Sequence, residues 1–338
     1  MTAEAFWQIY QGRGEQHDGI DRLPEPPPWR RFDGEILPDA EPQGRPLPEP
    51  RPGAEDRARA YRPEPPVTDM TNAALYLRRP LLVTGRPGTG KSTLAHSIAW
   101  ELKLGPVLYW PITSRSYLQE SLYRYDAIGR LQEANLRRLE HEGPPVTTAG
   151  PFITLGPLGT ALLARKRPRV VLIDEFDKSD IDLPNDLLNV LEEGQFTITE
   201  LVREHTEEPV RIATDDGLGA LVRGGLIRCH AFPIIVITSN GERVFPEAFK
   251  RRCLQVTISE PDQAKLAEIV RAQLGPEALD KTESLFRAFL AGRDAGDNLP
   301  TDQLLNAVFL ATSGLTDDAQ KRWQVAQALL DRSRSGEL

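Results

Sequence analysis

Residues 81–93 read Leu-Leu-Val-Thr-Gly-Arg-Pro-Gly-Thr-Gly-Lys-Ser-Thr, and this stretch decides the fold. An apolar run with the character of a buried strand enters a glycine-rich turn, and the turn leads into a helical segment. The turn matches the GxxxxGK[ST] pattern of a phosphate-binding loop in the strand–loop–helix context that gives the pattern meaning. Leu94, Ile98 and Leu102 recur at i, i+4 and i+8, so the segment that follows has one apolar helical stripe. This agreement on both sides disfavours a chance glycine-rich turn.

The residue types in this loop suit a nucleotide. The glycines let the backbone curl until its N–H groups point at phosphates, and the start of the helix adds the positive end of its dipole. We expect Lys91 to reach the β- and γ-phosphates of ATP and the Ser92 hydroxyl to ligate Mg²⁺. The predicted ATP-binding residues are Gly85, Arg86, Pro87, Gly88, Thr89, Gly90, Lys91, Ser92 and Thr93.

The composition is that of a soluble globular chain. The 338 residues suffice for one large core or two smaller ones, and the net charge of −8 gives no general attraction to nucleic acid or anionic membranes. No apolar run approaches the roughly 18 residues of a membrane helix, and the N-terminus lacks the pattern of a signal peptide. Cys229 and Cys253 are too few for a disulfide framework or a zinc site. We therefore expect a cytoplasmic protein.

Residues 1–66 differ in kind from the rest of the chain. Residues 25–31 and 45–52 are rich in proline and charge, and such a stretch cannot bury enough apolar surface to fold alone. We expect it to be extended, and either disordered or draped over a neighbouring surface. A passive tail is one possibility. The aromatic residues within 6–10 and Trp29 are candidate anchors on another surface, and they favour a segment that is draped over a neighbour.

Short apolar runs alternate with helical segments between residues 67 and 259. Continuously apolar strands separated by helices predict a parallel sheet covered on both faces. The candidate strands are 80–84, 107–110, 169–173, 233–238 and 254–258. From residue 260 to 338 only helical segments follow, at 262–273, 277–291, 300–313 and 316–333. The sequence therefore predicts an α/β core with a C-terminal α-helical domain.

Two carboxylates follow the strand predicted at 169–173. In a parallel sheet the carboxyl ends of the strands hold the site, so Asp174 and Glu175 are placed for chemistry. Asp174 is expected to hold the Mg²⁺ shell, and Glu175 to polarise the attacking water as general base. An acidic pair after a strand is often only a solvated strand end, but its place downstream of the phosphate loop favours the functional interpretation.

Asn240, Arg251 and Arg252 complete the candidate site. Asn240 follows the strand at 233–238 and could orient the water near the γ-phosphate; the alternative is a turn-capping Asn before Gly241. Arg251 and Arg252 could stabilise transition-state charge in the site of a neighbouring subunit. They could also stabilise the negative C-terminal end of their own helix dipole. Because the two arginines are adjacent, one can take each role.

These residues, in this order, resemble the AAA+ ATPases and more narrowly the MoxR family, over about residues 67–313. In the terms of that family, residues 85–92 look like Walker A, Asp174 and Glu175 like Walker B, and Asn240 like sensor 1. The arginines at 251 and 252 look like the arginine finger, and counting from Pro-Glu-Ala at 246–248 makes Arg252 the better match.

Two further stretches are similar to MoxR inserts, and one departs from the pattern. Residues 113–160, with the tyrosine-rich run 123–128, are placed like a helix-2 insert, and residues 195–230 like a pre-sensor-1 hairpin. The lid stretch 298–304 has no arginine where MoxR proteins carry sensor 2, so no sensor-2 residue is assigned. In this lid motif and in its insert the chain resembles a branch found in bacterial conflict systems.

The resemblance implies a homo-oligomeric ring, most often a hexamer, that hydrolyses ATP with Mg²⁺ and remodels partner proteins in a chaperone-like way. MoxR partners commonly carry a von Willebrand A domain. A nucleic-acid motor is an alternative, but in 195–230 the acidic residues outnumber the basic ones, which argues against a DNA-gripping hairpin. The acidic ones are Glu200, Glu204, Glu207, Glu208, Asp215 and Asp216, against Arg203, Arg211, Arg223 and Arg228. A slow ATP-dependent switch or scaffold in a defence system is the other alternative.

Overall fold

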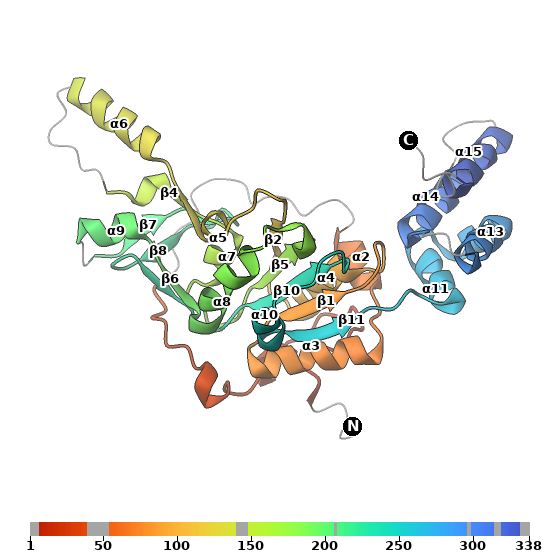
Figure 1. Cartoon of the computed structure of the whole chain (residues 1–338), viewed down its shortest axis with the longest axis horizontal. Coiled ribbons are helices and arrows are strands. Elements are labelled where there is room, and N and C mark those ends of the chain that lie inside the picture. The colour runs from red at the N-terminus through yellow and green to blue at the C-terminus, as the bar shows by residue number, and fades with distance from the viewer. Residues whose placement is uncertain are drawn as a thin grey trace. The chain divides into compact units, whose positions relative to one another are not determined.

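The computed structural model describes residues 7–38, 54–139, 148–205, 208–295, 299–313 and 319–331 (Figure 1). The chain divides into two compact units. The first comprises Met1–Thr84 and Ser92–Val256, and the second comprises Gly85–Lys91 and Thr257–Leu338. Parts of the predicted segments lie outside the described residues, namely 1–6, 39–53, 140–147, 206–207, 296–298, 314–318 and 332–338.

A five-stranded sheet forms the centre of the fold, in the order β11-β1-β10-β5-β2. Its strands are β1 (Leu81–Thr84), β2 (Leu108–Pro111), β5 (Val170–Asp174), β10 (Ile234–Ser239) and β11 (Leu254–Thr257). β10 pairs in parallel with both β1 and β5, and β5 pairs in parallel with β2. Each strand lies within one residue of its predicted ends. β1, β5 and β10 are almost continuously buried, as a sheet covered on both faces requires, whereas the edge strands β2 and β11 are only partly buried. The predicted α/β class is confirmed.

The helices of the first unit come before, between and after these strands along the chain. They are α2 (Ala54–Ala60), α3 (Pro65–Leu77), α4 (Lys91–Glu101), α5 (Leu118–Leu122), α6 (Ala127–Leu139), α7 (Pro157–Ala161), α8 (Leu183–Glu193), α9 (Thr199–Glu204) and α10 (Glu247–Arg252), with short 3-10 turns at Gly19–Arg22, Pro28–Arg30, Gly150–Phe152 and Phe176–Lys178. Among the described residues, no helix is both long enough and apolar enough to cross a membrane.

Three small antiparallel pairs accompany the two predicted inserts. In the stretch 113–160, β3 (Tyr123–Tyr125) pairs with β4 (Ile153–Leu155), and α6 rises from this pair, away from the sheet (Figure 1). In the stretch 195–230, β6 (Gln195–Thr197) pairs with β9 (Leu226–Arg228). Inside that pair, β7 (Val210–Ile212) pairs with β8 (Ala220–Val222).

The second unit is helical after β11. Its helices are α11 (Gln263–Leu274), α12 (Pro276–Lys281), α13 (Glu283–Asp294), α14 (Thr301–Thr312) and α15 (Ala319–Asp331). They bury one apolar cluster around Leu266, Phe289, Leu304 and Ala326. The one helix predicted over 277–291 is two helices, because the chain leaves helical geometry at Thr282, where φ is −128°. The predicted helical C-terminal part is thereby confirmed.

The described part of the N-terminal segment, residues 7–38, packs against the first unit. Ile9 and Tyr10 are fully buried. The Asn72 side chain in α3 accepts their N–H groups at 2.7 and 2.9 Å and donates to the Tyr10 carbonyl at 2.7 Å. The Tyr10 hydroxyl lies 2.8 Å from the Ser97 hydroxyl in α4. Ile9 and Tyr10 therefore pack on α3 and α4 of the chain's own core.

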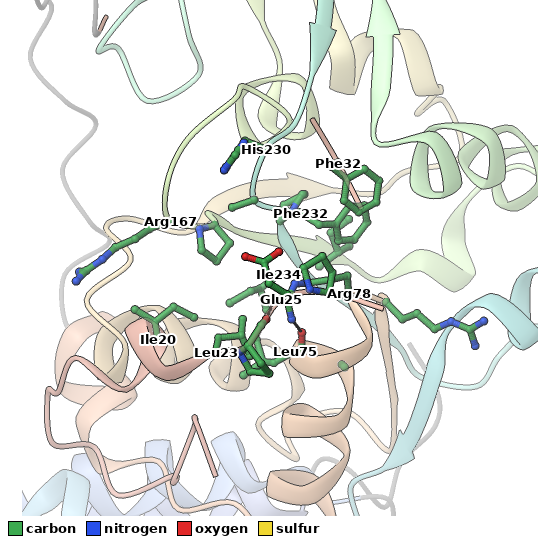
Figure 2. Close-up of a pocket in the computed structure, with 18 of the residues that line it drawn as sticks. Ile20, Leu23, Glu25, Phe32, Leu75, Arg78, Arg167, His230, Phe232 and Ile234 are labelled. Atoms are coloured by element: carbon green, nitrogen blue, oxygen red, sulfur yellow. Dashed lines mark hydrogen bonds between the residues drawn. The ribbon is translucent and has the colours of Figure 1, made fainter. Parts of the chain in front are cut away.

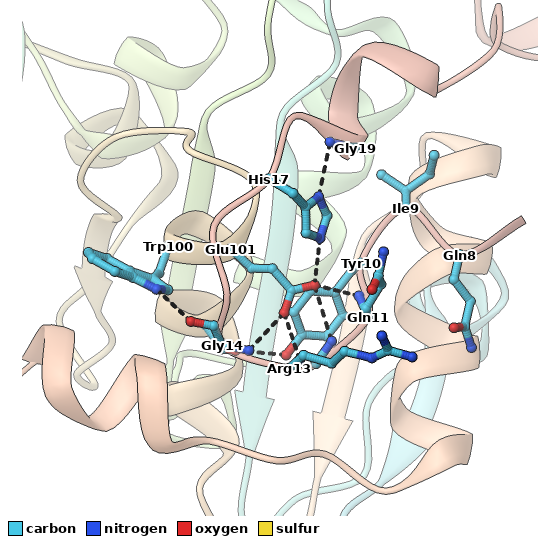
Figure 3. Close-up of polar contacts among 12 residues, drawn as sticks. Gln8, Ile9, Tyr10, Gln11, Arg13, Gly14, His17, Gly19, Trp100 and Glu101 are labelled. Carbon is cyan, nitrogen blue, oxygen red and sulfur yellow. Dashed lines mark hydrogen bonds and ion pairs between the residues drawn. The ribbon is translucent and has the colours of Figure 1, made fainter. Parts of the chain in front are cut away.

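The carboxylate of Glu101, the last residue of α4, holds this segment (Figure 3). Glu101 is fully buried and accepts the backbone N–H groups of residues 11–14 at 2.5, 3.2, 2.8 and 3.1 Å. His17 Nε2 lies 3.2 Å from the same carboxylate. Gly12 and Gly14 adopt φ of 69° and 72°, which turns successive N–H groups inward as in an anion-binding nest. A buried carboxylate requires such partners, so the segment and Glu101 stabilise one another.

Arg30 provides a second anchor at the opposite end of the segment. Its guanidinium is buried and donates to the carbonyls of Arg78, Leu191 and Glu192 at 2.6, 3.0 and 3.0 Å. These carbonyls lie at the C-terminal ends of α3 and α8, where the helix dipoles favour a cation. Between residues 20–33, α3 and the amino ends of β1 and β10 lies a cavity of about 520 Å³ (Figure 2).

Substitution of Glu101 by Gln tests the anchoring of the N-terminal segment. The amide keeps one acceptor oxygen but presents an NH₂ group to N–H donors, so we expect the free energy of unfolding to fall by about 1–3 kcal/mol. We also expect trypsin to cleave faster after Arg13 and Arg22. Chemical denaturation and limited proteolysis measure the two effects. Glu283→Gln, at a carboxylate that is 67% exposed on α13, is the matched control and should change neither. If trypsin cleaves Glu101→Gln no faster than the unaltered chain, Glu101 does not anchor the N-terminal segment.

Candidate active site

The candidate site lies at the carboxyl edge of the sheet in the first unit. β5 ends at Asp174, and β10 ends one residue before Asn240. Because β5 and β10 are parallel neighbours, their carboxyl ends meet at the same edge. α4 contributes Ser92 from its first turn. The structure thus brings together residues that are far apart in the sequence.

The Asp174 carboxylate accepts three hydrogen bonds from three different elements. Its Oδ1 accepts the Ser92 hydroxyl and the Thr238 hydroxyl, each at 2.6 Å. Its Oδ2 accepts the Tyr109 hydroxyl of β2 at 3.3 Å. Hydroxyl bonds to a charged carboxylate are stronger than those between neutral groups, so this cluster fixes the orientation of Asp174. A hydroxyl and a carboxylate this close are also the hard oxygen ligands that Mg²⁺ prefers.

Glu175 follows Asp174 in an unusual backbone conformation. Its φ and ψ are 60° and 46°, in the left-handed region that non-glycine residues seldom adopt. The Thr238 hydroxyl accepts its N–H at 2.9 Å. The Glu175 carboxylate is 48% exposed and lies 2.7 Å from Lys178 Nζ. The hydrogen bond from Lys178 to Glu175 raises the pKa of Lys178 above its usual value. Glu175 therefore leaves the strand end as an accessible, ion-paired carboxylate.

Asn240 is tied to the loop after β5 through its backbone. Its N–H donates to Asp177 Oδ2 at 3.1 Å, and the N–H of Glu242 donates to the same oxygen at 3.3 Å. Arg243 donates to the Ser179 carbonyl. The loops that follow β5 and β10 are therefore joined by three hydrogen bonds, although 63 residues separate Asp177 from Asn240.

An aromatic cluster connects this site to α10. Phe176, next to Glu175, stacks on Phe249 of α10 with 5.2 Å between ring centroids, and Phe245 lies 5.3 Å from Phe176 and 5.7 Å from Phe249. Phe176 and Phe249 are fully buried. These ring contacts therefore fix α10 against the loop that carries Glu175.

Arg252, the last residue of α10, has its ion pair with α8. Its Nε lies 2.8 Å from Glu192 Oε1, and Glu192 Oε2 lies 3.4 Å from Arg30 Nη1. Arg252 Nη1 donates to the carbonyl of Ala248 at 3.2 Å, as a cation at a helix C-terminus is expected to do. The side chain remains 40% exposed. Arg251 is exposed as well, and its carbonyl accepts a hydrogen bond from Arg79 at 3.3 Å.

The loop Gly85–Lys91 is organised around its own carbonyls. Lys91 is 7% exposed, and its Nζ donates to the carbonyls of Gly85 and Arg86 at 2.8 Å each. Gly88 has φ of 77°, and a Cβ there would lie 2.9 Å from Asp302 Oδ1, so only glycine fits. Pro87 is exposed, and Thr89 donates to the Arg86 carbonyl at 2.9 Å.

Arg86 links this loop to Glu260. Arg86 Nη1 lies 2.7 Å from Glu260 Oε1, and Arg293 of α13 pairs with the other carboxylate oxygen. The hydrogen bond from Arg293 and the charges of Arg293 and Arg86 hold the pKa of Glu260 below its usual range. α14 begins at Thr301, and none of residues 299–304 is an arginine; Asn298 lies outside the described residues. Arg293 also donates to the Pro261 carbonyl at 3.1 Å, in the linker before α11.

The two cysteines lie in the interior of the first unit. Cys229 and Cys253 are free and buried, and burial raises the pKa of each thiol to about 12. Both are therefore protonated near neutral pH and unsuited to nucleophilic chemistry. Within the described ranges, no three His, Cys, Asp or Glu side chains gather as a ready set of metal ligands.

Thr238 and Asp177 are site residues that sequence reasoning missed. Thr238 lies one position beyond Ile237, which is the partner of Ile173 in the β10–β5 register, so it stands beside Asp174. The sequence contains a polar residue at the end of an apolar strand but not the strand order that makes β10 the neighbour of β5. Asp177 resembles any solvated acid in a polar turn, yet it is 5% exposed.

A family model described as the AAA domain of the dynein-related subfamily matches residues 80–253, more than half of the chain. The match begins immediately before β1 and ends immediately after α10, so it includes Ser92, Asp174, Glu175, Asn240 and Arg252. A search among curated proteins found no match.

Proposed function

We propose that this chain, which belongs to the dynein-related subfamily of AAA domains, hydrolyses ATP and uses the energy to remodel or activate a partner protein. Membership of the family supports ATP-driven activity. The observation that carries the proposal is the Asp174 cluster, in which the serine of the phosphate-loop motif and the strand-end carboxylate share a 2.6 Å hydrogen bond. This contact joins two residues separated by 82 positions, and it supports the proposal because a hydroxyl and a carboxylate of this kind hold Mg²⁺ beside the phosphates in phosphoryl transfer.

Each predicted residue has a role that its position supports. Lys91 binds the β- and γ-phosphates, and Ser92 and Asp174 would hold Mg²⁺, whose charge offsets that of the phosphates. Glu175 accepts the proton of the attacking water, and Asn240 orients that water. Because the Glu175 carboxylate is accessible, rotation about its side-chain bonds can carry it from Lys178 toward a water molecule.

Arg252 supplies charge stabilisation to the site of a neighbouring copy in a ring. AAA+ domains commonly assemble in rings, and the resemblance of this chain to MoxR proteins favours a hexamer. Arg252 Nε lies 2.8 Å from Glu192 Oε1, and the side chain stays 40% exposed at the end of α10. A planar, always charged group held in this way suits the transition state of phosphoryl transfer.

The partner is most simply a protein. MoxR-like remodelling of a protein with a von Willebrand A domain rests on the resemblance alone. Against a nucleic-acid motor, the described residues of 195–230 include five acidic side chains and four arginines, and Glu207 lies outside them. Two of those arginines are already paired with the N-terminal segment, Arg223 with Glu35 at 2.7 Å and Arg228 with Asp33 at 2.9 Å. Tight, salt-sensitive binding of labelled DNA in fluorescence anisotropy would overturn this choice.

The second candidate is a slow ATP-dependent switch. The Glu175–Lys178 ion pair favours it, because a base engaged with a lysine is not yet directed at water. Phosphate release measured with and without proteins that co-purify in the presence of ATP separates the two. Absence of release in every assembled state would favour the switch.

Glu175→Gln is the test of hydrolysis. Removing the base while keeping shape should leave ATP affinity within about threefold and lower turnover by about 10²–10⁴-fold. Phosphate release and binding of a fluorescent ATP analogue measure the two quantities. Glu247→Gln, at an exposed carboxylate on α10, is the control and should match the unaltered chain. Turnover of Glu175→Gln near that of the unaltered chain would show that Glu175 is not the general base.

Arg252→Ala tests the trans arginine. We expect turnover to fall by about 10³-fold or more, because the developing charge loses its partner. Mixing with a Lys91→Ala subunit, which keeps Arg252 but cannot bind phosphates, should partly restore it. Arg251→Ala is the matched comparison and should retain most activity. No recovery in the mixture would assign Arg252 a structural role within its own subunit, through Glu192.

A further inference from the structure

We infer that Thr238 is a positioning residue. Its hydroxyl bonds both Asp174 and Glu175 and holds the backbone of Glu175 in the left-handed conformation from which the carboxylate acts. The inference deepens the proposed function and depends on it for the role of Glu175. Thr238 is 1% exposed, so its side chain has almost no access to solvent. Its effect must therefore pass through the groups that it contacts.

The Thr238 hydroxyl uses both of its hydrogen-bonding capacities. It donates its proton to Asp174 Oδ1 at 2.6 Å and accepts the N–H of Glu175 at 2.9 Å. A hydroxyl has one proton to donate and lone pairs with which to accept, so it can serve a carboxylate and an amide together. Valine has the same branched shape and can make neither bond. The two residues of the acidic pair are thus tied to one atom of the neighbouring strand.

The bond to the amide bears on the direction of the Glu175 side chain. At φ 60° and ψ 46° the chain turns sharply at the end of β5, which an L residue does only when its surroundings hold it there. Two backbone contacts of Glu175 do so: its N–H bonds to Thr238, and its carbonyl accepts the Lys178 N–H at 2.9 Å. If the first contact is lost, the residue can relax toward an extended conformation, and the carboxylate then leaves the strand end in another direction.

Thr238 also connects Glu175 to Asn240. Asn240 lies two residues further along, and the turn between them is closed by the Ser239 hydroxyl, which accepts the Gly241 N–H at 3.0 Å. A displacement of the tip of β10 would therefore reach both the water-orienting residue and the base. This is a physical route by which contacts of Asn240 can alter the placement of Glu175.

Thr238→Val and Thr238→Ser test the inference, together with Thr238→Val in the Glu175→Gln background. We expect the valine variant to lower kcat at least tenfold with Mg²⁺–ATP affinity within about threefold, and the serine variant to keep most of the activity. In the Glu175→Gln background, single-turnover measurements should show little further loss, because the residue being positioned is already inactive. Thr71→Val removes another buried threonine hydroxyl, which bonds the Val67 carbonyl at 2.7 Å, and should leave kcat unchanged.

Several outcomes overturn the inference. An unchanged kcat in Thr238→Val does so, as does an equal loss in both backgrounds. A loss of Mg²⁺–ATP affinity at unchanged kcat would assign Thr238 to Asp174 alone. If the valine variant fails to fold, Thr238→Ala carries the same expectations.

Hydrogen exchange at the Glu175 amide separates this inference from the proposed function. We expect its protection to be lost in Thr238→Val and kept in Thr238→Ser, whether or not the chain hydrolyses ATP. Protection kept in the valine variant contradicts the inference. Two results together would contradict the proposed function and leave the inference standing. They are full turnover in Glu175→Gln, and loss of the Glu175 amide protection in Thr238→Val but not in Thr238→Ser.

Discussion

The carboxylate of Asp174 is the constraint on which the site depends. It accepts hydroxyl groups from α4, β10 and β2, so three elements must converge on the end of β5. The order of the sheet, with β5 between β10 and β2, places both neighbouring strands beside that end. A carboxylate with three donors is also costly to move. The hydrogen bonds therefore hold Asp174 in one orientation, whereas the neighbouring side chains of Glu175 and Lys178 are half-exposed and can change rotamer.

Two buried charged side chains, Glu101 and Arg30, hold the N-terminal segment on the first unit. Glu101 gathers the N–H groups of residues 11–14, and Arg30 gathers carbonyls at the ends of α3 and α8. Arg30 also approaches Glu192, the residue that pairs with Arg252. The segment is therefore part of the structure that positions the proposed trans arginine.

The sequence predicted the elements with strong periodicity and the residues inside a motif. The five strands and the phosphate loop could be read directly, since buried parallel strands and glycine-rich turns leave clear local patterns. The N-terminal segment could not, because its prolines show no periodicity and its partners, Asn72 and Glu101, are distant. Glu101 at a helix end looks like an ordinary solvated acid until the donors that surround it are known.

The remaining differences have the same physical origin in long-range contacts. Thr238 becomes a site residue only through strand order, which one sequence does not contain. The ion pair of Arg252 with Glu192 joins two helices that the motif does not connect. Local patterns therefore identify which residues can do chemistry, while tertiary contacts decide which groups hold them in place.

If the Asp174 cluster belongs to an ATP-hydrolysing centre that a second copy of the chain completes, turnover must depend on both Mg²⁺ and assembly. Phosphate release from the purified chain, followed over a range of protein concentrations with Mg²⁺ present or chelated, measures this dependence. We expect release that requires Mg²⁺ and a turnover per chain that rises with protein concentration. Release that is insensitive to chelation, or no release at any concentration, would contradict it.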